Sequence, residues 1–239
     1  MRAKFINERE DLEKYNLIKR CTSILIKKIK DYLLNVWPTE ELQEDEDPGF
    51  FITPTFVFLI VMDIDDDDNF RGKYATKIEG GSGDNQIIIK WRPMCDLVNA
   101  IKDAPEDREY LISNFSWTSL SEIIFHEIVH RYDDLKYDIN KVVNKKLARM
   151  KSNYVNDEFL ELYYNSEAEH NAYFLGALND LLRLVDNRAL NIKGFSFEQF
   201  KSNFMGCTEF SDAVKGKWMK KWNKRIYDIY VKLKEQGKI

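Results

Sequence analysis

Two histidines stand four residues apart in the segment HEIVH (residues 126–130), and a glutamate follows the first of them. On a helix, residues at i and i+4 lie on one face, about 6 Å apart at Cβ, so the imidazoles of His126 and His130 can converge on one metal ion. Glu127 would lie where it can take a proton from a metal-activated water without binding the metal. This spacing predicts a zinc site with Glu127 as general base. The plainer interpretation is a surface helix whose two histidines bind nothing.

A catalytic zinc ion needs a third protein ligand and an open coordination position. Asp134 follows His130 by four residues, but it lies about 12 Å from His126 along a helix, since each residue rises about 1.5 Å. One ion cannot be reached from both ends of that span. Asp133 and Asp134 are therefore expected either to orient an imidazole by hydrogen bonding or to be polar residues at the end of the helix.

The third ligand is expected in the segment NSEAEHNAY, about forty residues further along the chain. This segment contains three candidates, Glu167, Glu169 and His170. Glu169 is followed by Ala172 and Gly176, small residues that would let two helices approach closely at the metal. A helical wheel instead places His170 and Glu167 on the apolar side of this helix, where a polar group without a partner would be costly. The residues alone leave the choice open.

The two segments together resemble a known family. HEIVHRYD followed by YYNSEAEHNAYF is similar to the gluzincin group of zinc metallopeptidases, particularly the minimal domains of phage and bacterial proteins. HEIVHRYD also looks like the mitochondrial inner-membrane processing metallopeptidases. The downstream family motif N-x-x-x-E-x-x-A falls on Asn165, Glu169 and Ala172. The resemblance covers about residues 118–185 and implies zinc-dependent hydrolysis of a protein or peptide substrate, with Glu169 as the third ligand.

Hydrophobic periodicity predicts the elements that position these residues. Strand-like runs occupy residues 50–64, interrupted at Pro54, and residues 73–91, where a Gly-Gly-Ser-Gly turn indicates a hairpin. The resemblance implies that such a hairpin offers its edge to the substrate. A capping box of Ser119 and Glu122 is expected to begin the histidine helix. Helical patterns cover residues 8–37, 95–113, 119–135, 139–151, 156–186, 197–205 and 211–235.

These elements predict an α+β, zincin-like fold, in which a small β-sheet in the N-terminal half precedes a mostly helical part with the HExxH helix. A length of 239 residues suits a single domain. Within it we expect a helical N-terminal extension over about residues 1–48 and a metallopeptidase core over about residues 50–190. A basic helical segment is expected to follow over about residues 195–239.

The composition is that of a folded protein, with 44% hydrophobic, 13% aromatic and 32% charged residues. The first residues alternate charges without an apolar run, which argues against a secretory signal. The longest apolar stretch, residues 56–62, is too short to span a bilayer, so no membrane partner is expected. Three cysteines without a C-x-x-C pair argue against a disulfide framework. The expected setting is the cytoplasm, or the host cytoplasm if a phage encodes the chain.

Residues 215–239 carry nine Lys/Arg against Asp228 and Glu235, a balance of +7 within a net charge of −4 for the whole chain. Their apolar residues recur at helical intervals, which predicts a helix packed on the domain with a solvated basic face. The alternative is a docking surface for nucleic acid or an acidic partner. A rival function follows from that alternative: a non-catalytic binding protein on the same scaffold. The presence of Glu127 favours the enzyme, because a decayed site often loses its general base.

Overall fold

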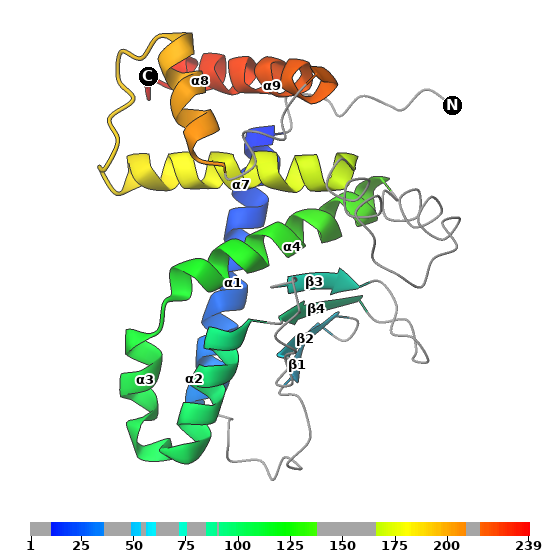
Figure 1. Cartoon of the computed structure of the whole chain (residues 1–239), viewed down its shortest axis with the longest axis vertical. Helices are drawn as coiled ribbons and strands as arrows, with labels where there is room; N and C mark the ends of the chain where they lie inside the picture. Colours follow the sequence, from blue (N-terminus) through cyan, green and yellow to red (C-terminus); the bar gives the residue numbers. More distant parts are fainter. Residues whose placement is uncertain are drawn as a thin grey trace. The chain divides into compact units, whose positions relative to one another are not determined.

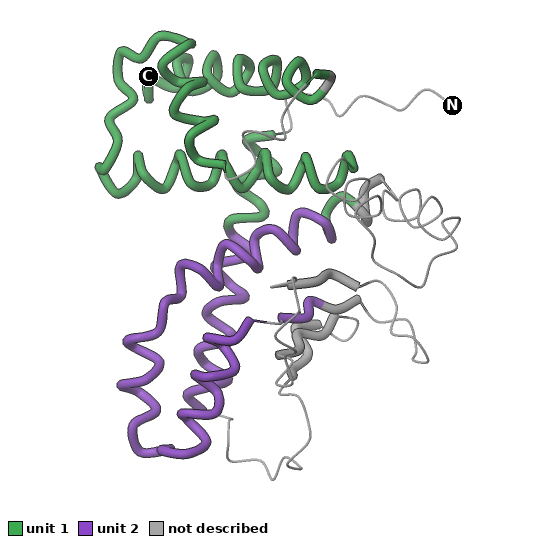
Figure 2. Tube along the Cα trace, in the orientation of Figure 1, with its two compact units in different colours: residues 1–19, 132–239 green, residues 20–131 purple. Residues whose placement is uncertain are grey.

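The computed structural model describes residues 11–35, 49–53, 56–60, 72–75, 85–89, 91–137, 166–208 and 216–239, with only the backbone described for residues 49–53, 56–60, 72–75, 85–86, 134–137 and 217. The helix expected over residues 139–151 lies outside this part of the chain. Figure 2 shows two compact units, one made of Met1–Lys19 and Tyr132–Ile239 (unit 1) and the other of Arg20–Arg131 (unit 2). Their boundaries fall inside two continuous helices, α1 and α4.

Figure 1 labels the helices and strands. The helices are α1 (Asp11–Asn35), α2 (Arg92–Asp103), the 3-10 turn η2 (Pro105–Asp107), α3 (Arg108–Asn114), α4 (Trp117–Tyr137), α7 (Glu167–Asp186), α8 (Phe197–Gly206) and α9 (Gly216–Glu235). The strands are β1 (Gly49–Thr53), β2 (Phe56–Ile60), β3 (Gly72–Ala75) and β4 (Asn85–Ile89).

Unit 2 is built around apolar residues that lie mainly on its helices. The most completely buried of them are Ile29, Leu33, Ile87, Ile89, Met94, Val98, Ile101, Leu120, Ile124 and Val129. Arg108, at the start of α3, donates to the backbone carbonyl of Leu34 near the end of α1 at 2.7 Å. Trp117, at the start of α4, donates to the carbonyl of Ile112 at 2.8 Å. These bonds fix the helix ends around the core, because they satisfy carbonyls that the helices leave without intrahelical partners.

The strands form a small sheet in the order β1-β2-β4-β3. β1 pairs antiparallel with β2, with Phe50 opposite Phe58 and an irregularity between Phe51 and Thr53. β2 runs parallel to β4, and β4 pairs antiparallel with β3, which therefore lies at an edge. Each strand has only four or five residues.

The α+β, zincin-like class expected from the sequence is wrong, because the structure is mostly helical. The N-terminal helix was expected to be an extension ahead of the sheet. Instead α1 contributes buried residues to both units, including Tyr15 and Ile18 in unit 1 and Ile29 and Leu33 in unit 2. Local patterns indicate extended backbone, but fold class depends on which elements bury the core, and the described core lies mainly on helices. The segment boundaries expected from the sequence do not coincide with the two units.

Unit 1 has an aromatic core between α7, α8 and α9. The ring of Phe174 lies 5.0 Å from that of Phe204 and 5.2 Å from that of Trp222. The Tyr230 hydroxyl donates to the carbonyl of Phe195 at 3.0 Å, which holds the turn before α8 against α9. Burial of such large rings is the main favourable contribution to packing here.

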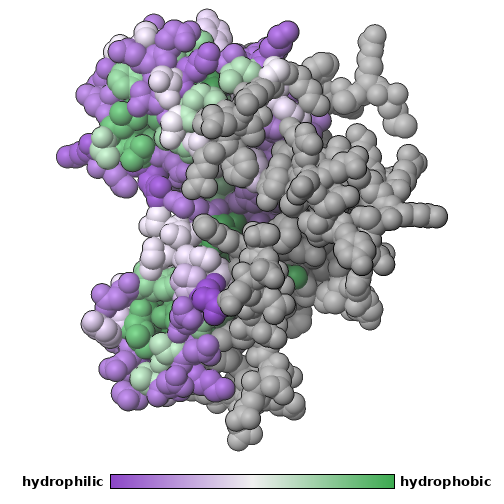
Figure 3. Space-filling model, in the orientation of Figure 1, coloured by the Kyte–Doolittle hydropathy of each residue, from purple (hydrophilic) through white to green (hydrophobic). Residues whose placement is uncertain are grey.

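Figure 3 shows that the described surface on this face is largely hydrophilic, with smaller hydrophobic areas. Large apolar side chains exposed by 39% to 69% are Leu17, Ile24, Tyr110, Leu184 and Tyr227. They lie on four different helices, and single exposed apolar residues are normal on a folded surface. None of the described helices is both long and apolar enough to cross a membrane.

Candidate metal centre

Helix α4 carries His126, Glu127 and His130 near its middle. It is held by apolar side chains on the same turns, Ile124 and Val129 being completely buried. The helix begins at Trp117, so Ser119 lies inside it and the expected capping box of Ser119 with Glu122 is wrong. The signal failed because a short Ser-x-x-Glu motif also occurs within helices.

Helix α7 begins at Glu167, with Ser166 as its N-cap. The Ser166 hydroxyl accepts a hydrogen bond from the backbone N–H of Glu169 at 3.2 Å, which fixes the first turn. Residues 168–172 are all buried, including the charged Glu169 at 2% exposure. Five consecutive buried residues occupy every face of a helix, so a helical wheel that assigns one buried face could not rank Glu169 against His170.

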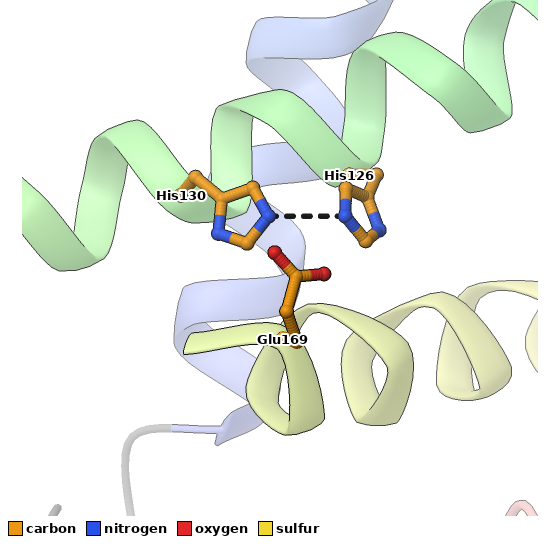
Figure 4. A group of neighbouring side chains, drawn as sticks. All are labelled: His126, His130 and Glu169. Atoms are coloured by element: carbon orange, nitrogen blue, oxygen red, sulfur yellow. Dashed lines mark hydrogen bonds between the residues drawn. The ribbon is translucent and has the colours of Figure 1, made fainter. Parts of the chain in front are cut away.

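Figure 4 shows the side chains of His126, His130 and Glu169 pointing towards one another from α4 and α7. One possible ligand atom from each of these three residues lies within 4.8 Å of the others. The two imidazole Nε2 atoms are 3.0 Å apart, with ring planes at 80°. We call these three residues the donor group.

The donor group fits a zinc ion in the types of its ligand atoms and in the distance between the two histidine nitrogens. Two ligands about 2.0–2.1 Å from a tetrahedral zinc lie roughly 3.3 Å apart, close to the 3.0 Å between the histidine nitrogens. A hydrogen bond between the imidazoles would also give that distance. The carboxylate of Glu169 adds a third donor, and two nitrogens with one oxygen are a set found in catalytic zinc sites.

Two buried carboxylates lie in or beside the donor group. Glu127 and Glu169 are exposed by only 6% and 2%. Positive charge close to a buried carboxylate stabilises its ionised form, because burial removes most of the water that would solvate it. The neutral imidazoles that bind zinc bring no charge of their own, whereas a divalent ion would bring two positive charges to these carboxylates.

The two other candidates for third ligand lie elsewhere. Glu167 is at the surface, where its carboxylate accepts from Lys221 at 3.2 Å. The ring of His170 stacks on Trp218, with centroids 4.0 Å apart and planes at 16°. The structure therefore brings together Glu169 and the histidines of α4, as the family resemblance implies, while metal binding itself stays a prediction.

Ala172 and Gly176, the small residues that favoured Glu169 in the sequence, differ in their surroundings. Ala172 is completely buried, as expected for a residue at a close contact. A Cβ added to Gly176 would meet no described atom within 4 Å. Among the described residues, therefore, no neighbour comes close enough to require a glycine at this position, in contrast to the role expected for Gly176.

Asp133, one turn after His130, is buried to 1% exposure. Its carboxylate accepts from the ammonium of Lys14 on α1 and from the side-chain amide of Asn171 on α7. Burial lowers the pKa of Lys14, and the carboxylate of Asp133 offsets this in part. Asp133 was expected to orient an imidazole or to be a polar residue at the end of the helix. Its hydrogen bonds are instead to Lys14 and Asn171. Asp134 lies where only the backbone is described.

The contacts of Asp133 continue to α9. The guanidinium of Arg225 donates at 2.8 Å to the side-chain oxygen of Asn171 and through two bonds of 2.9 Å to the carboxylate of Asp11. Asp11, Lys14, Asp133, Asn171 and Arg225 form what we call the ionic network, and all of them belong to unit 1. Sequence reasoning missed this network. The available signal was that Asp11 and Lys14 fall on the same helical face as Ile18 and Leu25.

Helix α9 packs through Trp218, Trp222, Ile226, Ile229 and Leu233, all exposed by 7% or less. The predicted packed helix is present in this part of the chain. Two of its basic residues make contacts within unit 1, Lys221 with Glu167 and Arg225 in the ionic network. A partner for the remaining basic face stays a prediction.

No protein-family model matches the chain, and neither a curated protein nor a solved structure matches it.

Proposed function

We propose that the chain is a zinc-dependent peptidase, with zinc held by His126, His130 and Glu169 and with Glu127 as general base. The convergence of the three donor atoms within 4.8 Å carries this proposal. Further support comes from the burial of Glu127, which follows a histidine of the donor group directly. Three protein ligands with a general base on the same helix are typical of catalytic zinc sites in peptidases.

When bound, a zinc ion supplies Lewis acidity, which activates water and polarises a carbonyl group. The protein residues have separate tasks. His126 and His130 would bind the metal from one face of α4, and the helix sets the distance between their Cβ atoms. Glu127 accepts the proton of the attacking water and passes it to the leaving amine. Its low exposure keeps bulk water from competing for that proton.

The proposed substrate is a protein or peptide in the cytoplasm. Support for a reducing compartment comes from the cysteines, since Cys21, Cys95 and Cys207 form no disulfide in the described part of the chain. Among the described strands, β3 lies at an edge of the sheet, and an extended peptide can bind to such an edge as an added strand.

The test begins with metal analysis of the purified protein, for which we expect about one zinc per chain. Glu127→Gln should keep that zinc and lower cleavage of a mixed peptide library, followed by mass spectrometry, by about 10²- to 10⁴-fold. Glu167→Gln is the matched control, since this surface glutamate on α7 bonds Lys221 and should alter neither metal content nor cleavage.

Two results would contradict the proposal in different ways. A chain that binds no zinc would exclude the metal site. A zinc-replete chain that cleaves no peptide would exclude the peptidase and favour the non-catalytic binding role. Among the described residues, no contact favours the non-catalytic binding role.

A further inference from the structure

Asn171 joins the two helices that carry the donor group. Its side-chain nitrogen donates to Asp133, and its side-chain oxygen accepts from Arg225 at 2.8 Å. A carboxylate can only accept and a guanidinium can only donate, so the orientation of the amide is fixed by its neighbours. Asn171 is exposed by 2%, so water does not compete for these bonds.

The bond between Asn171 and Asp133 lies close to the ligands in sequence. Asp133 is three residues after His130, which is one turn of α4, and Asn171 is two residues after Glu169 on α7. The bond is contained within unit 1, and α4 is continuous through His130 and Asp133. A shift of α7 along α4 would break it and would move Glu169 relative to the histidine.

The charged members of the ionic network hold this bond in place. Lys14 from α1 contacts one oxygen of Asp133, and Asn171 contacts the other. Arg225 from α9 is held on Asp11 by two bonds and lies 3.7 Å from the centre of the Phe174 ring. Bidentate guanidinium–carboxylate pairs restrict geometry strongly. Both sides of the Asn171–Asp133 bond are therefore braced by residues outside the donor group.

We infer that Asp133 and Asn171 are positioning residues for the proposed metal site: their hydrogen bond sets the register of α4 against α7 and so the affinity for zinc. This inference rests on the proposed function. It goes beyond it because it assigns a role to the first and last helices of the chain that the structure describes, which supply Lys14, Asp11 and Arg225.

The sharpest test exchanges the two side chains. Asn171→Asp places a second carboxylate against Asp133, and we expect zinc affinity to fall by about 10- to 100-fold, as for other residues that support metal ligands. The double variant Asp133→Asn with Asn171→Asp keeps the total charge. In it the amide now at position 133 accepts from Lys14 and donates to the carboxylate now at position 171, which in turn accepts from Arg225. Zinc affinity should return close to the wild-type value.

Affinity is measured by competition with a chromogenic chelator, using zinc alone as the probe. The visible absorption of the cobalt-substituted protein gives a second readout, because it reports the geometry of the ligands rather than the stability of the fold. Wild type and the double variant should share one spectrum, and Asn171→Asp should differ. Circular dichroism verifies that each variant is folded. If Asn171→Asp does not fold, Asn171→Ser removes the same two bonds without adding charge.

Asp186→Asn is the control, because Asp186 pairs with Lys19 and so links the same two helices, α1 and α7, at the surface. Its zinc affinity should equal that of wild type. Wild-type affinity in Asn171→Asp, or equal loss in the single and double variants, would overturn the inference while leaving the proposed function intact. A wild-type chain without zinc affinity would overturn the proposed function and the inference together.

Discussion

The donor group and the ionic network are two buried polar clusters of different composition. The ionic network contains two cations and two anions with an amide between them, so its charges balance within the protein. The donor group offers one carboxylate and two imidazoles beside Glu127, and two nitrogens with one oxygen are a set of ligands that zinc binds. The difference separates a cluster that holds helices together from one that we propose as a metal site.

The largest expected effect is in the ionic network. Lys14→Met leaves the carboxylate of Asp133 buried without its cation, and we expect the free energy of unfolding to fall by about 3–5 kcal/mol. Urea denaturation of the metal-free protein measures this. Adding Asp133→Asn removes the stranded charge and should recover most of the loss. A loss below about 1 kcal/mol in the single variant, the range of exposed pairs, would mean that the network is not balanced internally.

The donor group should show its stabilisation only when metal is present. At a zinc concentration about 100-fold above the dissociation constant, the free energy of unfolding should rise by about 2.7 kcal/mol. Glu169→Gln should abolish this gain, whereas Glu167→Gln should retain it because Glu167 bonds Lys221 at the surface. An undiminished gain in Glu169→Gln would remove Glu169 from the donor group.

A substitution of His170, which follows Glu169 directly, tests whether this histidine is a metal ligand. His170→Phe retains an aromatic ring against Trp218, so the free energy of unfolding should change by about 1 kcal/mol. Zinc content, measured by elemental analysis, should stay the same. Loss of zinc in this variant, with the protein still folded, would instead make His170 a ligand.

The smallest effect is expected at a surface pair. Lys19 and Asp186 are 3.0 Å apart, but their side chains are exposed by 46% and 63%. Asp186→Asn should therefore lower the free energy of unfolding by less than about 1 kcal/mol in urea denaturation. A larger loss would weaken the contrast between buried and exposed ion pairs that separates the ionic network from ordinary surface charges.

The part of the site that lies within one helix could be predicted from sequence. The spacing of His126 and His130 needs only the geometry of α4, and helical periodicity placed α4, α8 and α9 near their observed ranges. The helix expected over residues 156–186 is observed as α7, which begins only at Glu167. The choice among Glu167, Glu169 and His170 could not be made from residue patterns, because five consecutive residues of α7, 168–172, are buried and no single face of the helix stands out. Packing against other helices decides where each side chain points.

The ionic network could not be predicted because its members are far apart in sequence. Lys14 and Asp133 are separated by 119 residues. A lysine in a charged helix is predicted to be solvent-exposed when its partner is unknown. The fold class failed for a related reason. Strand-like segments were visible locally, whereas the contribution of α1 to the core depends on contacts with distant helices.

The contact between Asp11 and Arg225, which are 214 residues apart, has a consequence for biosynthesis. Unit 2 is one uninterrupted stretch of chain, so its residues are all available to fold while translation continues. Unit 1 combines the start of α1 with α7, α8 and α9, and Asp11 must wait for its partner until α9 leaves the ribosome. Closure of unit 1, and with it the bracing of the proposed metal site, therefore cannot come before the synthesis of α9.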